Sequence, residues 1–384
     1  MKRIIALALT VSFLMLMWVG LPKISSAQEY SLNLNAKSAI LMDAATGEVL
    51  YEQEADVALP PASVTKIMTL LLVMEAIEAG RISLDDEVTI SAEAASMGGS
   101  QVFLEEGERM RAEELIKCVV IASANDAALA LAEHIAGSET AFVAAMNERA
   151  KELGMTNTHF ENATGLDDTV TNHLTSAYDI ALMSRELIKH DVVTKYSNVW
   201  QDSIRNGEFV LTNTNRLVRY YDGCTGLKTG STDKAGFCVS ATAMRDGMHL
   251  IAVVMGAETR DDRNEAARAM LDYGFSSYAL YTEPESVLEK VEVTRGVIDC
   301  VDVCSSDFAK LVNKSDKKRI EKEYSIPEKL VAPLKEGEVV GYVVYKLDGE
   351  EIGKSEVFVK EDVAEITAFD LFMRMLKIIF TGAR

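Results

Sequence analysis

The sequence predicts an α+β protein in which an antiparallel sheet flanked by helices, with a helical lobe, precedes a small all-β domain and a C-terminal amphipathic helix. A strand–turn–strand pattern at 38–51 is matched by a second hairpin pattern at 235–256. Helical spacing of apolar residues fills most of the sequence between the two patterns. From about residue 284 this spacing gives way to alternation of apolar and polar residues, which is typical of antiparallel strands.

The N-terminus predicts export. Two basic residues at 2–3 precede an apolar run at 4–20, and the small residues Ser25-Ser26-Ala27 follow. This order is typical of a secretory signal peptide, which we predict to span residues 1–27. A retained N-terminal anchor is the alternative. Both leave the rest of the chain outside the cytoplasm.

Composition excludes several function classes. The chain has 384 residues and 48% hydrophobic residues, enough for two folded domains. Its net charge of -20 argues against a nucleic-acid partner, because phosphate binding requires clustered cations. The five histidines and five cysteines lack the spacings of a metal site, so we expect no metal and no cofactor. An odd number of cysteines does not indicate a disulfide scaffold. A Cys224–Cys238 pair is the alternative to free thiols.

The first domain is predicted at 36–283. A nearly all-apolar helix runs over 63–79 and is therefore buried on most sides, with Gly80 at its C-terminal cap. The other expected elements are helices at 109–121, 126–135, 175–190 and 263–273, and strands at 235–243 and 248–256 joined by Arg245-Asp246-Gly247.

A small β domain is predicted at 284–361, with strands within 287–303 and 339–359, a tight turn at Asp348-Gly349 and a charged loop at 315–322. The last segment, 363–384, has an apolar helical face and charges on the other side. The segment is short for a membrane span and carries charges within it. We therefore expect an amphipathic helix at the outer face of the cytoplasmic membrane. A helix docked on the protein's own core is the alternative.

The first motif with chemical content is Ser63-Val64-Thr65-Lys66, at the start of the buried helix. Positions i and i+3 share a helix face, so the Ser63 hydroxyl and the Lys66 amine can meet. A lysine can take a proton from a serine when burial or a nearby cation lowers its pKa. Alone the motif is weak, since a surface serine and lysine give the same pattern.

Two further motifs follow along the chain. Ser123-Ala124-Asn125 separates two helical stretches and exposes a hydroxyl and an amide; a simple helix cap is the alternative. Lys228-Thr229-Gly230 precedes the second hairpin. Its glycine permits close approach of a substrate backbone, and its cation and hydroxyl suit a carboxylate. A turn before a strand is the alternative.

The order SxxK, SxN, KTG, with gaps of roughly 60 and roughly 100 residues, is far more specific. It resembles the penicillin-recognising serine enzymes, and among them the low-molecular-mass D-alanyl-D-alanine carboxypeptidases. The resemblance covers about residues 36–283 closely and the later segments in general layout. The matching segments are 60–69 (PPASVTKIMT), 162–166 (NATGL), 175–179 (TSAYD) and 228–232 (KTGST).

The resemblance implies the penicillin-recognising fold and an exported serine enzyme. It would remove the terminal D-Ala from peptidoglycan stem pentapeptides and bind β-lactams covalently. Ser63 would be the acylated nucleophile, Lys66 its proton acceptor and Ser123 a proton relay to the leaving amine. The oxyanion hole would be the backbone N–H groups of Ser63 and Ser231. The implied substrate-binding residues are Asn125, Lys228, Thr229, Gly230, Ser231 and Arg263.

Two other functions remain open on the sequence. A β-lactamase shares two of the motifs, but Ala124 stands where class A enzymes carry Asp, and no deacylating Glu is recognised; Glu161 is not a convincing substitute. A non-catalytic sensor of peptidoglycan stems could keep the cleft, although all the named positions are intact. Turnover of penicillin or release of D-Ala would separate these readings.

Overall fold

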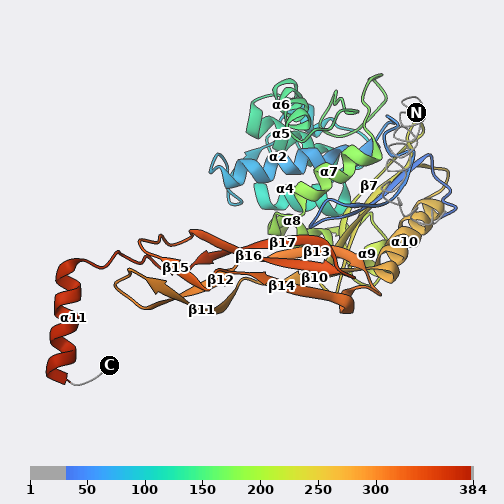
Figure 1. The fold of residues 1–384 in the computed structure, drawn as a ribbon. Helices are drawn as coiled ribbons and strands as arrows, with labels where there is room; N and C mark the ends of the chain where they lie inside the picture. Colours follow the sequence, from blue (N-terminus) through green and yellow to red (C-terminus); the bar gives the residue numbers. More distant parts are fainter. Residues whose placement is uncertain (1–31, 382–384) are drawn as a thin grey trace, which may run out of the picture. The chain divides into compact units, whose positions relative to one another are not determined.

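The computed structural model describes residues 32–381. Its main sheet is antiparallel throughout, with strand order β2-β1-β9-β8-β7. Strand β7, at one edge of this sheet, is labelled in Figure 1. All residues of β1 are buried because this strand lies inside the sheet, paired with β2 and β9. The two predicted hairpins therefore belong to one sheet. Its strands are β1 Ser38–Asp43, β2 Val49–Gln53, β7 Cys224–Thr232, β8 Gly236–Arg245 and β9 Met248–Ala257.

The two turns between β7, β8 and β9 fix the register of the sheet. Asp246 and Gly247 adopt φ values of 50° and 79° between paired Arg245 and Met248, as the Asp-Gly turn predicted. At the other turn Thr232 pairs with Gly236. This turn centres near residue 234, so Cys238 lies opposite Gly230 and Cys224 opposite Ala243. The alternative of a Cys224–Cys238 disulfide is wrong, and all five cysteines are free.

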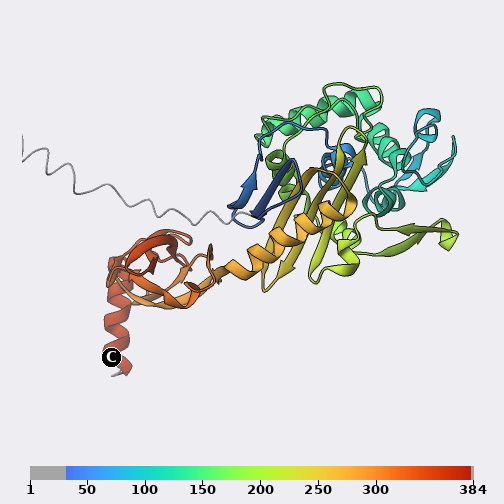
Figure 2. The ribbon, with the colours of Figure 1, turned by 90° about the vertical axis from the view of Figure 1, so that its right-hand side faces the viewer.

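Helices cover both faces of this sheet (Figure 2). On one face, α7 (Ala177–Leu187) packs against β9 and β1, and α2 (Lys66–Glu78) packs against α7. On the other face, α10 (Arg260–Ser277) packs against β9 and β8. Gly274 of α10 faces Leu250 and Leu41 closely, so the helix and the sheet are in direct contact. The expected arrangement of a sheet between helices is confirmed.

The helical lobe differs from expectation at its edge. The predicted helix at 109–121 begins only at α4, because Arg109–Arg111 forms strand β4 beside β3. Met110 is buried between two exposed arginines, which is the period of a strand. The elements of the lobe are β3 Glu87–Thr89, α3 Ala92–Ala95, β4 Arg109–Arg111, α4 Ala112–Lys117, the π-helical turn η2 Cys118–Ala122, α5 Asn125–Ala136 and α6 Glu139–Glu152.

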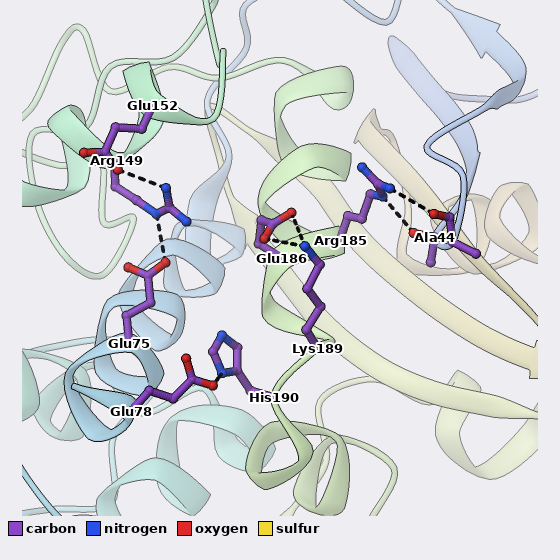
Figure 3. Close-up of polar contacts among 10 residues, drawn as sticks. Ala44, Glu75, Glu78, Arg149, Glu152, Arg185, Glu186, Lys189 and His190 are labelled. Atoms are coloured by element: carbon purple, nitrogen blue, oxygen red, sulfur yellow. Dashed lines mark hydrogen bonds and ion pairs between the residues drawn. The ribbon is translucent and has the colours of Figure 1, made fainter. Parts of the chain in front are cut away.

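Polar contacts attach the far end of α2 to its neighbours (Figure 3). The Nε atom of Arg149 on α6 lies 2.8 Å from Glu75, and Nδ1 of His190 lies 2.8 Å from Glu78. Arg185 of α7 donates to the backbone oxygen of Ala44 beyond β1. Each such contact contributes little alone, about 0–1 kcal/mol. The contacts of Glu75 and Glu78 hold this end of α2, whose opposite end carries Lys66.

The remaining elements of this part are short. They are the 3-10 turn η1 Ala62–Thr65, α8 Asp191–Ser197, the hairpin β5 Gln201–Ile204 and β6 Phe209–Thr212 with the 3-10 turn η3 Arg205–Gly207, and α9 Leu217–Tyr220. β5 pairs with β6 in a separate two-stranded sheet.

From Tyr278 onward the chain forms strands around a core of its own, to which Tyr281 of β10 also belongs. Six strands have the order β14-β16-β17-β12-β11-β15, and β10 pairs with β13 in a separate two-stranded sheet. Half-buried Phe308 of β13 stacks on buried Tyr345 of β16, with ring centres 3.9 Å apart. Asp348-Gly349 turns between β16 and β17 as predicted, but the predicted loop at 315–322 is partly wrong, because β14 begins at Ile320. The strands are β10 Tyr278–Glu283, β11 Ser286–Thr294, β12 Cys300–Ser305, β13 Phe308–Asn313, β14 Ile320–Ser325, β15 Lys329–Val331, β16 Val339–Leu347 and β17 Glu350–Val359; the 3-10 turn η4 spans Lys317–Arg319.

A helix, α11 (Ala368–Thr381), is present near the C-terminus as expected. Within residues 32–381, none of the helices has the length and apolar character needed to span a bilayer. The predicted signal peptide, residues 1–27, lies outside the described residues.

Candidate active site

The SxxK motif forms a turn followed by a helix. Ser63 lies in η1, and the α-helix begins only at Lys66. The predicted i, i+3 contact nevertheless forms, with the Lys66 Nζ atom 2.9 Å from the Ser63 Oγ atom. Ser63 is partly exposed and lines a cleft, whereas Lys66 is fully buried. The nucleophile candidate therefore faces solvent while its partner amine is held in the interior.

The contacts of the Lys66 amine suit a proton acceptor. Besides Ser63, Nζ contacts Asn125 Oδ1 at 2.5 Å and the Thr164 carbonyl oxygen at 2.7 Å. Both of these atoms can only accept hydrogen bonds. A neutral amine has two N–H groups, which these oxygens satisfy, and one lone pair. The lone pair then points at the Ser63 hydroxyl.

Burial favours this neutral form. Removal from water lowers the pKa of Lys66 well below its ordinary value, and the positive charge of Lys228 lowers it further. The buried carboxylate of Asp126 acts in the opposite direction. The net effect is a lowered pKa of Lys66, which favours the neutral amine that can accept a proton.

The second and third motifs meet each other directly. Lys228 Nζ donates to Ser123 Oγ at 2.8 Å and to the Thr229 carbonyl oxygen at 2.9 Å. Burial and the neighbouring Arg263 lower the pKa of Lys228 to about 7. Ser123 ends η2 in a left-handed conformation, with φ of 63°. That conformation is unfavourable for a serine and interrupts the two helices, so that the hydroxyl is directed to the cleft.

Two glycines allow distant segments to close on η1. A Cβ atom at Gly230 would lie 2.7 Å from the backbone nitrogen of Ser63, so only glycine lets β7 approach the nucleophile turn. Gly165 has φ of 82°, and a Cβ there would lie 1.8 Å from the Ala62 carbonyl oxygen. These approaches bring segments 164–165 and 228–231 to the two sides of Ser63.

The cleft beside Ser63 and segment 229–231 has a volume of about 620 Å³. Of the predicted site residues, Ser63, Ser123, Thr229, Gly230, Ser231 and Arg263 line it. Lys66, Lys228 and Asn125 lie behind this surface and are almost fully buried. Within residues 32–381, no group of three or more His, Cys, Asp or Glu side chains is arranged to hold a metal ion.

Asn125 is engaged within the protein. Its Oδ1 atom accepts from Lys66, and its Nδ2 atom donates to the Gly98 carbonyl oxygen at 2.7 Å. A hydrogen bond from this amide to a substrate would therefore have to replace the contact with Gly98. In the described structure Asn125 orients Lys66.

The sequence prediction missed three groups around the site. The Thr164 carbonyl belongs to the recognised segment 162–166, but a backbone acceptor leaves no mark in a sequence. His173 contacts Thr65 Oγ1 through Nε2 at 2.8 Å and accepts from the Glu161 N–H at Nδ1, at 3.0 Å. Asp126 accepts from the backbone N–H groups of the loop at 102–104. Asp126 directly follows the second motif, and that adjacency was the available signal.

Comparisons with known proteins agree with this geometry. Residues 23–259 match the family model of D-alanyl-D-alanine carboxypeptidase, and residues 275–365 match that of the penicillin-binding protein 5 C-terminal domain. D-alanyl-D-alanine carboxypeptidase DacF of Bacillus subtilis is 44% identical over 85% of this chain and 86% of its own length. DacC of Escherichia coli is 36% identical over 87% of this chain and 85% of its own.

Solved structures show the same fold. Penicillin-binding protein 5 of Haemophilus influenzae superposes with a TM-score of 0.73 at 31% identity, over 87% of this chain and 99% of that one. Penicillin-binding protein D2 of Listeria monocytogenes, solved in an ampicillin-bound form, gives 0.59 at 33% identity over 64% of this chain and 99% of its own. The chain therefore belongs to the D-alanyl-D-alanine carboxypeptidase family of serine peptidases, hydrolases of peptidoglycan metabolism.

Proposed function

We propose that this chain removes the terminal D-Ala of peptidoglycan stem pentapeptides through an acyl-enzyme on Ser63. The observation that carries the assignment is the set of contacts at Lys66 Nζ. Two acceptors hold its N–H groups, and the remaining contact, at 2.9 Å, is the Ser63 hydroxyl. General-base activation of a serine requires this geometry.

In the proposed reaction, Lys66 takes the Ser63 proton as Oγ attacks the carbonyl carbon between the two D-Ala residues. The backbone N–H groups of Ser63 and Ser231 receive the developing oxyanion. The C–N bond breaks as Ser123, held by Lys228, relays a proton to the leaving amine. Water then hydrolyses the ester, which releases the tetrapeptide and restores Ser63.

The terminal carboxylate is proposed to bind at the Lys228–Thr229 end of the cleft. Arg263 is 3% exposed and lines the same cleft, so a cation stands beside this end. A carboxylate that reaches partly buried cations gains charge-assisted hydrogen bonds. The same groups would hold the carboxylate of a β-lactam, and Ser63 would be acylated by it.

The test compares Ser63→Ala with the unmodified protein. Release of free D-Ala from a pentapeptide ending in D-Ala-D-Ala and labelling by fluorescent penicillin should both disappear in the variant, with an unchanged circular dichroism spectrum. Labelling of the variant would remove Ser63 from the role. An unmodified protein that binds the pentapeptide but releases no D-Ala would be a sensor, and rapid penicillin turnover would indicate a β-lactamase.

Peptidoglycan lies outside the cytoplasm, and a carboxypeptidase of its stems works there. Export through residues 1–27 is supported by the sequence pattern of that segment. We propose that α11 attaches to the outer face of the cytoplasmic membrane, where the membrane meets water. Its aromatic side chains are exposed, with Phe369 at 69%, Phe372 at 52% and Phe380 at 83%. Burial of such side chains among lipid chains is favourable.

Co-sedimentation with phosphatidylcholine vesicles tests this attachment. Binding should fall strongly in a Phe372→Asp, Phe380→Asp double variant, because carboxylates replace two aromatic side chains that would be buried in the membrane. Lys377→Gln on the same helix serves as the control and should keep most of the binding. Equal binding by the double variant would remove α11 from this role.

A further inference from the structure

A second cavity lies at the C-terminal end of α10. Its volume is about 660 Å³, within the range of small-molecule sites. Arg263 of α10 lines the cleft beside Ser63, whereas Phe275 of the same helix lines this cavity, and along a helix these positions are about 18 Å apart. The cavity is therefore separate from the active site. We call it the junction pocket, and its lining includes Arg245, Met248, Phe275, Leu280, Lys317 and Lys318.

Part of the lining of the junction pocket is apolar. Met248, from the start of β9, is 3% exposed, and Phe275, from the last turn of α10, is 8% exposed. Leu280 of β10 lies beside them and is half-buried. A ligand with an apolar part would shield these side chains from water, which is favourable.

The rest of the lining is mainly basic. Lys314, Lys317 and Lys318 are exposed, Arg245 is half-buried, and Asp246 is the acidic residue among the lining residues. The protein as a whole has a net charge of -20. Four basic side chains and one acidic side chain therefore reverse the sign of charge locally, and this arrangement favours an anion.

Stabilisation of the helix end explains only one of the three lysines. Cations are favourable at a helix C-terminus, and Lys314 Nζ donates to the Phe275 carbonyl oxygen at 3.3 Å. Lys317 Nζ donates instead to the Leu280 carbonyl oxygen in β10, at 2.8 Å. Within residues 32–381, the side chain of Lys318 has no hydrogen-bond or ion-pair partner. An ammonium group has three N–H donors, so Lys317 and Lys318 keep donors for a ligand.

Arg245, in contrast, is held by its neighbours. Its guanidinium lies 4.6 Å from the ring centre of Tyr221 and 4.7 Å from that of Phe275. It also donates to the Asp222 carbonyl oxygen at 2.9 Å, and the carboxylate of Asp272 lies 3.8 Å away. Arg245 therefore contributes a fixed and partly neutralised charge, and the lysines are left as the main anion-binding groups.

The junction pocket is far from α11. Strands β10 and β11 pair with β13 and β12 as one long antiparallel hairpin, whose open end is the pair Tyr278–Asn313. The turn at the other end carries Val297 and Asp299, and Arg374 of α11 contacts both. At about 3.3 Å per residue, the open end and the turn are several tens of ångströms apart. With α11 attached to a membrane, as proposed above, a lipid within that bilayer does not reach the pocket.

We propose that the junction pocket binds a phosphate monoester with an apolar body, as a single molecule outside the bilayer. The phosphate lies among Lys314, Lys317 and Lys318, because lysine ammonium groups bind phosphate as point charges and its oxygens accept several hydrogen bonds. The apolar body lies against Met248 and Leu280. The bound molecule then links the turn between β8 and β9 to the chain that follows β13. This binding does not involve Ser63 and is independent of the proposed reaction.

Calorimetric titration with octyl phosphate, below the concentration at which it forms micelles, tests the proposal. Octyl glucoside has the same chain without the charge, and inorganic phosphate has the charge without the chain. Both should bind at least tenfold more weakly than octyl phosphate. Absence of octyl phosphate binding would overturn the proposal. Equal binding of octyl glucoside would show an uncharged apolar pocket, and equal binding of inorganic phosphate would show an anion site alone; either result would also overturn it.

Variants locate the binding. A Lys317→Gln, Lys318→Gln double variant should bind octyl phosphate at least tenfold more weakly, and Leu280→Ala about fivefold more weakly. The matched control is a Lys335→Gln, Lys360→Gln double variant, because both lysines are exposed and neither lines the pocket. Its affinity should change less than about twofold. Circular dichroism spectra check that each variant folds.

Two results would assign octyl phosphate to another place. Unchanged affinity in the Lys317→Gln, Lys318→Gln variant would exclude the junction pocket. Loss of binding in the Phe372→Asp, Phe380→Asp variant would place the octyl chain on α11. Co-sedimentation with phosphatidylglycerol vesicles should be the same with and without Lys317 and Lys318. A loss of that co-sedimentation would make a bilayer lipid the occupant, and each of these three results would overturn the proposal.

Discussion

The sheet that carries the cleft and the β domain after residue 283 bury very different side chains. Around the cleft, Lys66, Asp126, Lys228 and Arg263 are all at most 3% exposed. Among the described residues of strands β11 to β17, the buried polar side chains are Ser305 and Ser355. The ions of the β domain pair at its surface instead, as Arg319 does with Asp348. Burial of charge is costly, so its concentration in one part marks where chemistry is done.

Positive φ angles on residues other than glycine occur in both parts, for example at Arg295 in the β domain, but their positions differ. In the β domain, positive φ angles at Asp348 and Gly349 serve a tight turn, and these residue types tolerate them. Near the cleft, positive φ angles fall on Ala62 and Ser123. Neither residue type favours this conformation. Both residues adjoin a hydroxyl or amine of the site. The strained conformations are maintained because the surrounding contacts require them.

The largest expected effect is on the rate of acylation, and it distinguishes Lys66 from Lys346. Lys66→Ala should lower the rate of acylation by penicillin about 10³-fold, because the proposed base for Ser63 is lost. Lys346→Ala, in the β domain, removes a partly exposed lysine paired with Glu323 and should leave the rate unchanged. Stopped-flow acylation measures both. Near-normal acylation of Lys66→Ala would require another base.

The second expected effect is on the free energy of unfolding. The same substitution, Asp to Asn, is compared at Asp126 and at Asp348. Asp126 Oδ2 accepts from the N–H groups of Val102 and Leu104, and Oδ1 accepts from that of Ala127 at 2.9 Å. In Asp126→Asn an amide NH₂ must face one of these donors in either orientation. We expect a loss of about 3 kcal/mol in the free energy of unfolding, measured with urea.

Asp348→Asn is the control for this substitution. Asp348 lies at a positive φ that asparagine tolerates, and its ion pair with Arg319 is exposed. Its unfolding free energy should change by less than about 0.5 kcal/mol. Asp126→Asn also removes the negative charge that supports the Lys66 ammonium, so the acid limb of acylation should shift to lower pH. A cost below that of Asp348→Asn would contradict the assigned role of Asp126.

The two parts also differ in how far the sequence predicts them. Alternating residues and the Asp-Gly turns predicted the hairpins β8–β9 and β16–β17, because both signals are local. The three motifs predicted four of the residues that line the cleft, namely Ser63, Ser123, Thr229 and Gly230. Their convergence could be expected only from the resemblance, since the approach of β7 to η1 depends on contacts between Gly230 and Ser63, far apart in the chain.

The groups that hold the motifs in position were not predictable in this way. The Thr164 oxygen acts through the backbone, and any residue type supplies the same atom. His173 acts on a threonine more than one hundred positions earlier, so no spacing rule connects the two. The prediction of a helix at 109–121 was wrong at its N-terminal end for a related reason. Three residues of strand β4 gain their stability from pairing with β3, not from their own propensity.

The smallest expected effect concerns His173 and the pH dependence of stability. Its Nδ1 atom accepts from a backbone N–H, and its Nε2 atom must then carry the proton donated to Thr65 Oγ1. Protonation of the ring would break the contact with Glu161. Burial lowers the pKa of His173 to about 4; the carboxylates of Glu161 and Asp167 oppose this shift, and His159 and Lys66 add to it.

This lowered pKa has a defined consequence for stability. Below pH 6.5 the unfolded chain gains a proton at this histidine that the folded chain does not bind until about pH 4. The free energy of unfolding should therefore fall by about 2 kcal/mol from this group between neutral pH and pH 5. In His173→Gln, urea titrations at several pH values should lack this part of the dependence. His134→Gln, at an exposed histidine beside Asp86, should keep it. An unchanged pH slope in His173→Gln would mean that another group gives rise to it, and the neutral ring would then have no special part in holding the turn that carries Ser63.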